Sequence, residues 1–276
     1  MRHPTTTAGE ASRITELENE SIYILREAYR KFSKPAMLWS MGKDSAALLW
    51  LVRKAFFGKT PFPVVHIDTT YKMPEMIRFR DAKAAQWGLN LLVTKNRAAL
   101  KAGVSPEKGK LKCCTALKTH ALRELLKKEK YDAIFLAIRR DEEGTRAKER
   151  YFSPRGPGFE WNFKDQPPEL WSQFQTDSRE GAHVRVHQLL RWTEVDVWKY
   201  IRRENIPVIP LYFAKNGKRY RSLGCLPCTA PINSHAGTVT EIILELETIR
   251  TSERAGRAQD KADDYAMQKL RTEGYM

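Results

Sequence analysis

The amino-acid sequence predicts an α/β fold: a doubly wound, mostly parallel sheet with helices on both faces, followed by a C-terminal helical or irregular extension. Two observations lead to this class. Short apolar runs alternate along the chain with helical patterns of about ten to fifteen residues, which is typical of parallel βαβ units. Small polar residues follow several of these runs, at the carboxyl ends of the expected strands, where α/β sheets bind ligands.

The first half of the chain supplies four expected strands, each an apolar run flanked by helical patterns. The chain opens with apolar residues three or four positions apart and carboxylates toward the start, a pattern that predicts an amphipathic helix. Pro74 suits the first turn of a later helix. The expected elements are helix 11–32, strand 36–39, a helix through Val52, strand 63–69, helix 74–87, strand 89–93, helix 114–130 and strand 131–138.

The second half of the chain is less regular. Between 151 and 181 proline, glycine and many aromatic residues predict a long but ordered loop. Residues 184–187 are a candidate fifth strand, and Thr193 is expected to cap a helix whose first turn carries carboxylates. A further helix is expected over 239–250, ahead of a charged tail.

Composition limits the class of protein. The 276 residues suit one large domain with appendages, and a hydrophobic content of 42% with seven tryptophans is typical of a folded protein. No apolar run approaches the roughly 18 residues of a membrane span, and the first ten residues lack the apolar core of a signal peptide. We therefore expect a cytoplasmic protein without membrane contact. The net charge of +15 would attract nucleic acid, an acidic protein, or small anions such as nucleotide and sulfate. Because the cations are spread along the chain, a solvated surface is favoured over a nucleic-acid groove.

A loop of small and charged residues joins the first expected strand to its helix. It reads Ser40-Met41-Gly42-Lys43-Asp44-Ser45. The N–H groups of such a loop and of the first helical turn point at one place, and the helix dipole favours negative charge there. Gly42 permits a close approach of the backbone, Lys43 adds a cation, and the serine hydroxyls can donate to phosphate oxygens. The loop is not a Walker A sequence, whose first glycine and spacing are missing, but it predicts an anion site.

Two other segments lie where strands are expected to end. Asp68 and Thr69 follow the second strand and are candidate contacts to a nucleotide, whereas His66 within that strand is interpreted as a core histidine with one hydrogen-bond partner. The segment 138–150 follows the fourth strand and holds five cations and four carboxylates. Its guanidinium groups present planar donor forks suited to sulfate or phosphate, and Arg139 and Arg140 adjoin a buried strand, where a charge needs a partner. An oxyanion site is therefore favoured over a self-neutralising surface loop.

Several segments together resemble the small subunit of bacterial two-subunit ATP sulfurylases (sulfate adenylyltransferase subunit 2). The S-x-G-K-D-S loop alone resembles the wider PP-loop ATP pyrophosphatases, which include the phosphoadenylylsulfate reductases and thiolation enzymes, and the arginine-rich segment and the tail narrow the match. The similarity runs from about Leu17 to the end of the chain. The segments that carry it are 40–45, 66–69, 139–143, 146–150, 167–171, 192–201, 221–225, 252–254 and 274–275.

The resemblance implies adenylyl transfer from ATP to sulfate, giving adenylyl sulfate and pyrophosphate in sulfate assimilation. It implies a PP-loop nucleotide-binding α/β domain, expected over 16–215, between a flexible N-terminus over 1–15 and a cysteine-containing segment with a charged tail over 216–276. The residues expected to bind ATP with Mg²⁺ are Ser40, Met41, Gly42, Lys43, Asp44, Ser45, Asp68 and Thr69. Lys43, Arg139 and Arg140 are the expected catalytic residues, and Arg139, Arg140 and Arg146 the expected sulfate ligands. Because the product lies uphill, the family couples the reaction to GTP hydrolysis by a separate large GTPase subunit, so such a partner and an oligomeric assembly are expected.

The four cysteines leave two interpretations open. Cys113-Cys114 and the pair Cys225 and Cys228 can supply four thiolates to Zn²⁺ or to a four-iron, four-sulfur cluster. Alternatively, the adjacent pair is one buried and one exposed thiol, and the C-x-x-C an ordinary turn. The arrangement also resembles adenylyl-sulfate reductases, but these need a cysteine in a C-terminal Glu-Cys-Gly segment, and none follows Cys228. Reductase chemistry is therefore disfavoured.

Two other functions compete with sulfate adenylylation. One is a PP-loop ATP pyrophosphatase that energises sulfur insertion into DNA (phosphorothioation) or tRNA, which would account for the positive charge and for an iron–sulfur centre. Only this alternative needs a nucleic-acid partner. The other is a non-catalytic nucleotide-binding regulatory subunit, which would keep the loop at 40–45 but would not need Arg139, Arg140 and Arg146.

Overall fold

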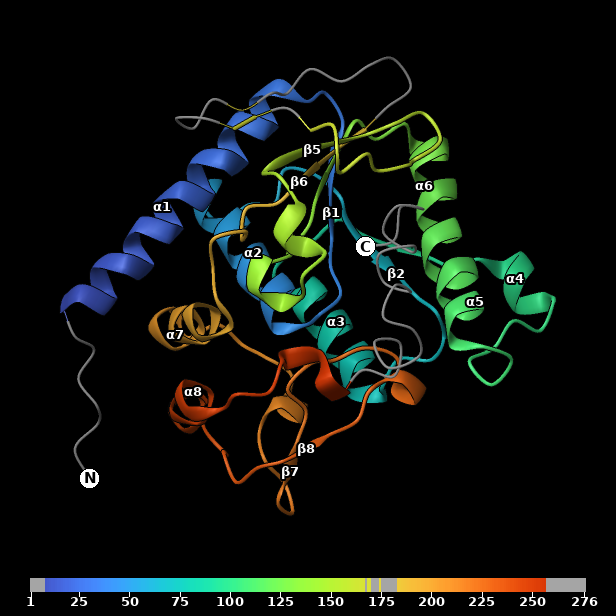
Figure 1. The fold of residues 1–276 in the computed structure, drawn as a ribbon. Coiled ribbons are helices and arrows are strands. Elements are labelled where there is room, and N and C mark those ends of the chain that lie inside the picture. The colour runs from blue at the N-terminus through green and yellow to red at the C-terminus, as the bar shows by residue number, and fades with distance from the viewer. Residues whose placement is uncertain (1–7, 167, 170–173, 175–182, 257–276) are drawn as a thin grey trace.

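A six-stranded sheet forms the centre of the molecule (Figure 1). The computed structural model describes residues 8–166, 168, 169, 174 and 183–256. The strand order is β3-β2-β1-β4-β6-β5, and all neighbours pair in parallel except β5, which runs antiparallel to β6 at one edge. The strands are β1 (Pro35–Leu38), β2 (Val64–Ile67), β3 (Leu91–Thr94), β4 (Ala133–Phe135), β5 (Phe152–Arg155) and β6 (His183–Val186). The predicted mostly parallel sheet is confirmed.

Helices cover both faces of the sheet because the buried strands are apolar on both sides. In β1, Met37 belongs to a core cluster that includes residues of α1, α2, α7 and α8, while its neighbour Leu38 belongs to a second cluster that includes residues of α6. Figure 1 shows the first group on one side of the strands and α6 on the other. The helices are α1 (Ala8–Lys31), α2 (Lys43–Ala55), α3 (Pro74–Gln86), α4 (Arg97–Lys101), α5 (Lys110–Cys114), α6 (Ala121–Glu129), α7 (Glu194–Glu204) and α8 (Val239–Thr248). None of the helices in the described part of the chain is long and apolar enough to span a membrane.

The first helix extends into the segment predicted to be flexible. The expected flexible N-terminus covers 1–15, whereas α1 begins at Ala8. Two contacts explain this: Ile14 is buried in the core, and the Arg13 guanidinium donates to both carboxylate oxygens of Asp196 at 3.0 and 2.8 Å. Residues 1–7 lie outside the described part.

Three other differences from the sequence prediction are local. The edge strand β5 lies inside the predicted long loop 151–181, where Pro154 obscures the strand signal and is tolerated because the strand is at an edge. The expected helix 114–130 starts earlier, at Lys110, and contains a π-helical stretch, Thr115–His120, between α5 and α6. The short α4 was not predicted. Trp171 and most of the later part of the long loop, with the tail beyond 256, lie outside the described residues.

The region after the main sheet supplies the remaining walls of the site. Thr193 caps α7 as predicted, in a capping box with Asp196. The strands β7 (Lys218–Arg219) and β8 (Ile232–Asn233) form a small antiparallel sheet, and α8 packs on α7. After α8 the chain turns back, so that a short 3₁₀ helix, Glu253–Gly256, reaches the carboxyl ends of the central strands.

Candidate functional site

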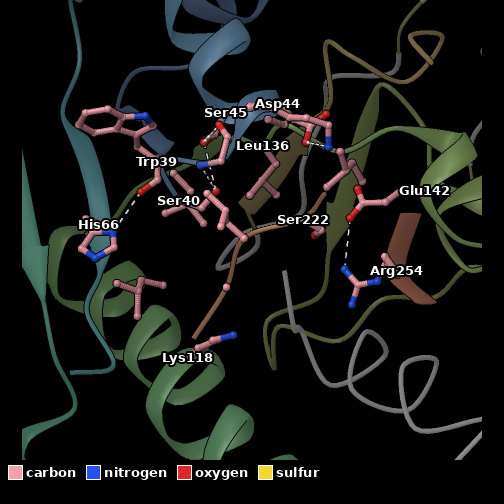
Figure 2. Close-up of a pocket in the computed structure, with 18 of the residues that line it drawn as sticks. Trp39, Ser40, Asp44, Ser45, His66, Lys118, Leu136, Glu142, Ser222 and Arg254 are labelled. Atoms are coloured by element: carbon pink, nitrogen blue, oxygen red, sulfur yellow. Dashed lines mark hydrogen bonds and ion pairs between the residues drawn. The ribbon is translucent and has the colours of Figure 1, made fainter. Parts of the chain in front are cut away.

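A pocket lies at the carboxyl ends of β1, β2 and β4, where open α/β sheets bind ligands. Figure 2 shows the loop at 40–45 on one wall, with His66 on one side of it and Glu142 and Arg254 on the other. Apolar side chains of β1, of β2 and of the residue after β4 line one part of the pocket: Leu38, Val65, Ile67 and Leu136. Its charged lining consists of five cations and three carboxylates: Lys43, Lys72, Lys118, Arg146, Arg254, Asp44, Glu142 and Glu253.

The loop is built as a strand-to-helix turn. Gly42 has an extended conformation (φ −65°, ψ 162°) immediately before α2, and Met41 adopts a left-handed φ of 62° with its side chain buried in the core. Ser40 Oγ lies 3.1 Å from Ser45 Oγ and accepts from the Gly42 N–H at 3.4 Å. Met41 does not line the pocket. The other residues of the loop do: Ser40, Gly42, Lys43, Asp44 and Ser45.

Tyr212 closes the loop from the other side of the pocket. Its hydroxyl accepts a hydrogen bond of 2.7 Å from the backbone N–H of Lys43, the first residue of α2. The side chain is 1% exposed and its ring packs edge-on against Trp198 of α7. A residue almost 170 positions away thus holds the N-terminus of the anion-binding helix, and nothing in the sequence around the loop indicates it.

The two innermost cations of the site are already paired with carboxylates. Lys43 and Arg139 are 1% and 0% exposed, and both donate to Asp44 and to Glu253. Arg139 also contacts Asp141 at 2.9 Å. Burial by itself would raise the pKa of Glu253, but the positive charges of Lys43 and Arg139 hold that pKa well below its usual value. Glu253 is therefore an ionised carboxylate, and it is paired with the two cations that the sequence predicts to bind the ligand.

A second charged cluster lies at the pocket wall. Glu142 uses one carboxylate oxygen for Arg146 and the other for Arg254, the latter at 3.2 Å. Arg254 also contacts Glu143 at 3.1 Å. All three of Glu142, Arg146 and Arg254 line the pocket. The cluster thus presents two guanidinium groups whose separation is set by one carboxylate.

The structure brings only some of the predicted site residues to the pocket. Arg146 and the loop residues named above line it, whereas Arg139 lies behind the loop in its ion pairs and does not. The guanidinium of Arg140 lies 5.4 Å from the centre of the Tyr151 ring and donates to the Glu149 carbonyl, away from the pocket.

The two residues after β2 also face elsewhere. Asp68 pairs with Lys95 at 2.9 Å and accepts from the Thr70 N–H, and these contacts lower its pKa although burial opposes the change. Thr69 Oγ1 lies 3.1 Å from Cys225 Sγ. Neither Asp68 nor Thr69 lines the pocket.

His66 has the single hydrogen bond that the sequence interpretation expects. Its Nδ1 lies 3.1 Å from the Trp39 carbonyl oxygen, which can only accept, so Nδ1 carries the proton. Burial lowers the pKa of His66 to about 4. The ring is therefore neutral at pH 7.

The four cysteines are buried thiols that two distant segments of the chain bring together. Burial first, and then the nearby thiols of Cys114, Cys225 and Cys228, raise the pKa of Cys113 to about 11. Cys113 and Cys114 end α5, and Cys225 is held beside the strand end by a hydrogen bond from the Leu226 N–H to the Tyr71 carbonyl. Within the described ranges, however, no three histidine, cysteine or carboxylate side chains are arranged to hold a metal ion.

Comparisons with known proteins agree with this geometry. Residues 34–231 match the model of the phosphoadenosine phosphosulfate reductase domain. The chain is 44% identical to sulfate adenylyltransferase subunit 2 of Geotalea uraniireducens over 97% of this chain and 99% of the relative, and 43% identical to that of Allorhizobium ampelinum over 94% and 92%. Among solved structures, it is similar to phosphoadenylyl-sulfate reductase of Candida auris (TM-score 0.56, 17% identity, 79% of this chain and 96% of that chain). It is also similar to FMN adenylyltransferase of Candida glabrata in complex with ATP (TM-score 0.58, 16% identity, 100% and 87%). At these identities, the two solved structures support the fold alone.

Proposed function

The chain belongs to the phosphoadenosine phosphosulfate reductase domain family and, within it, to the sulfate adenylyltransferase subunit 2 proteins, and on this premise we propose that it transfers the adenylyl group of ATP to sulfate. The products are adenylyl sulfate and pyrophosphate, and the chain is the catalytic small subunit of an ATP sulfurylase. The observation that carries this proposal is 44% identity to a named subunit 2 over nearly the full length of both chains.

We assign the loop at 40–45 to the pyrophosphate part of ATP. The N-terminus of α2, the Ser40 and Ser45 hydroxyls and Lys43 meet at the pocket, which is the set of groups that binds phosphate oxygens. Mg²⁺ accompanies the nucleotide and neutralises part of its charge. The apolar wall that includes Leu38 and Leu136 is the surface on which we place the base. Asp68 and Thr69 are engaged outside the pocket, so this assignment does not need them.

The loop cations are released to the ligand by exchange. Lys43 and Arg139 both hold Glu253, so a phosphate group that binds them takes the place of this carboxylate. Arg139 lies behind the loop, where it pairs with Asp44 and with the phosphate group that has replaced Glu253. Lys43 lines the pocket and is the catalytic cation that stabilises charge on the leaving pyrophosphate.

Sulfate is a weak nucleophile, so the protein must contribute position and charge. The attacking sulfate oxygen forms a bond to the α-phosphorus while the bond from that phosphorus to pyrophosphate breaks, with no covalent enzyme intermediate needed. Arg146 is the predicted oxyanion ligand that lines the pocket, and we assign sulfate to it. Arg140 faces Tyr151 and is given no part in this assignment.

The assembly follows from the energetics. The relatives are named as second subunits, which implies a first. Adenylyl sulfate lies uphill from ATP and sulfate, and nothing in this sequence resembles a GTPase, so we propose a large GTPase subunit as the partner, in the cytoplasm. Nucleic acid is not required.

We further propose that Cys113, Cys114, Cys225 and Cys228 are the ligands of a metal centre, Zn²⁺ or a four-iron, four-sulfur cluster. Four buried thiols that converge from two segments match the donor set of either centre, although ligation needs their side chains to rearrange. Metal analysis and the visible spectrum of anaerobically purified protein test this. A matched Cys225→Ser variant should lose the metal, and wild-type protein that holds neither zinc nor iron would contradict the assignment.

The test of the main proposal is run in the direction that is favourable without GTP. The purified chain is given adenylyl sulfate, pyrophosphate and Mg²⁺, and ATP formation is followed; the forward reaction is followed as sulfate-dependent pyrophosphate release. Lys43→Ala should abolish both, whereas Lys59→Ala, an exposed lysine away from the pocket, should leave them unchanged. Pyrophosphate release from ATP that ignores sulfate would contradict the proposal and point to the sulfur-insertion alternative.

A further inference from the structure

The C-terminal segment after α8 reaches both halves of the proposed reaction site. Glu253 sits on the loop cations Lys43 and Arg139, and the next residue, Arg254, lies at the pocket wall beside Glu142. The segment is fastened from behind, because the Arg221 guanidinium donates to the Thr251 carbonyl at 2.7 Å. Two consecutive side chains therefore point to two different subsites of one pocket.

The surroundings of Arg254 resemble those of an anion-binding residue more than those of a surface ion pair. Its side chain is 11% exposed, Arg146 is 8% and Glu142 9%. Arg146 comes from a 3₁₀ turn after β4, whereas Arg254 comes from the far end of the described chain, and Glu142 bridges them with its two oxygens. Figure 2 shows the Glu142–Arg254 contact on the side of the loop away from His66.

A tetrahedral oxyanion suits two guanidinium groups held at a fixed separation, since each planar fork can donate to two of its oxygens. A substrate that displaced Glu142 would remove the carboxylate that sets the separation of the two guanidinium groups. The role of Glu142 is to orient the two arginines, while Glu143, 3.1 Å from Arg254, adds a second anchor.

We propose that Arg254 is a substrate-binding residue that, together with Arg146, holds the sulfate group, and that Glu142 positions both. The proposal rests on the function proposed above and extends it, because the sulfate subsite then includes a residue from the C-terminal segment. The competing interpretation is that the Glu142–Arg254 pair only fastens that segment.

Two ligands that differ only in the sulfate group separate these interpretations. Dissociation constants of AMP and of adenylyl sulfate are measured by calorimetry on the full chain for the wild type, Arg254→Gln, Arg254→Lys and Arg250→Gln. Arg250 is an exposed cation four residues earlier and is the matched control for net charge. The ratio of the two constants reports the sulfate contacts alone.

We expect Arg254→Gln to weaken adenylyl sulfate binding about 30-fold, the effect of losing a charge-assisted contact, with AMP binding changed less than about twofold. Arg254→Lys keeps the charge but not the planar guanidinium, so its affinity for adenylyl sulfate should lie between those of the wild type and Arg254→Gln. Arg250→Gln should bind adenylyl sulfate as the wild type does. Equal weakening of both ligands, or an unchanged ratio, would overturn the role of Arg254 while leaving the main proposal intact. A wild-type chain that binds neither ligand would overturn both.

Discussion

Removing the charge of Glu253 tests whether this carboxylate holds the place of a phosphate group. In Glu253→Gln the side chain keeps its length and one neutral acceptor but loses its negative charge. The carboxylate accepts from Lys43 and Arg139, both almost completely buried. Hydrogen bonds to charged groups contribute about 1.5–3 kcal/mol each, and Asp44 still pairs with both cations, so we expect the ligand-free protein to lose about 2 kcal/mol of stability.

The same substitution should strengthen pyrophosphate binding. If pyrophosphate takes the place of Glu253, the substitution destabilises the ligand-free protein but not the pyrophosphate-bound protein. The loss of about 2 kcal/mol in the ligand-free protein therefore appears as a gain in pyrophosphate affinity of about 30-fold. The loss of stability and the gain in affinity should therefore be equal in size. The assay combines urea unfolding of the ligand-free protein with calorimetric titration of magnesium pyrophosphate.

A matched control separates local exchange from the general effect of charge. Glu247→Gln makes the same change in net charge at a carboxylate of α8 that is 45% exposed and pairs with Lys199 at 3.0 Å. It should change pyrophosphate affinity less than about twofold, because exposed charges are screened by solvent. Weaker pyrophosphate binding in Glu253→Gln, or an equal gain in both variants, would refute the exchange.

Three further predictions concern the frame of the site. Tyr212→Phe leaves the Lys43 N–H without its acceptor and should cost about 1 kcal/mol of stability and a few-fold of ATP affinity, measured against Tyr23→Phe, an exposed tyrosine. Because the pKa of His66 is about 4 when folded and about 6.5 when unfolded, the unfolded chain binds more protons below pH 6.5, and stability should fall as pH is lowered from 6.5 to 4. His66 should account for about 2 kcal/mol of that loss at pH 5, and His66→Asn, which can still donate to the Trp39 carbonyl, should flatten the slope of urea stability against pH; an unchanged slope would contradict this. Glu149→Gln should destabilise the fold by about 3 kcal/mol, since it removes the charge of the buried carboxylate that pairs with buried Arg155 at 2.7 Å, and a loss below about 1 kcal/mol would be inconsistent with that pair.

Local patterns in the sequence predict the parts of the structure that depend on neighbours in the chain. The strand-to-helix loop at 40–45, the order of strands and helices through β4 except for the short α4, and the cap of α7 at Thr193 follow from apolar spacing and end signals a few residues long. The edge strand β5 does not, because its pairing with β6 depends on the fold around it, and Pro154 removes the local signal.

The direction of a charged side chain is not encoded locally, and this accounts for the difference at Arg139. The sequence shows correctly that a charge next to a buried strand needs a partner. The structure supplies that partner from Asp44, Asp141 and Glu253, the last of these 114 residues away. The pocket residues Tyr212 and Arg254 escaped prediction for the same reason, since they reach the site only after the chain has folded back.

Ion pairing within the site has a consequence for how tightly it can hold its ligands. A phosphate group that met two bare buried cations would gain their full attraction, but bare cations at this depth would cost several kcal/mol each in the ligand-free protein. Because Asp44 and Glu253 both pair with Lys43 and Arg139, that cost is avoided, and a ligand that replaces Glu253 gains only the difference between its own contacts and those of this carboxylate. Pyrophosphate is the product that must leave, so a carboxylate that returns to the same cations assists its departure. The carboxylate and Arg254 belong to one short 3₁₀ helix, so the exchange at the loop and the proposed sulfate contact involve the same segment of the chain.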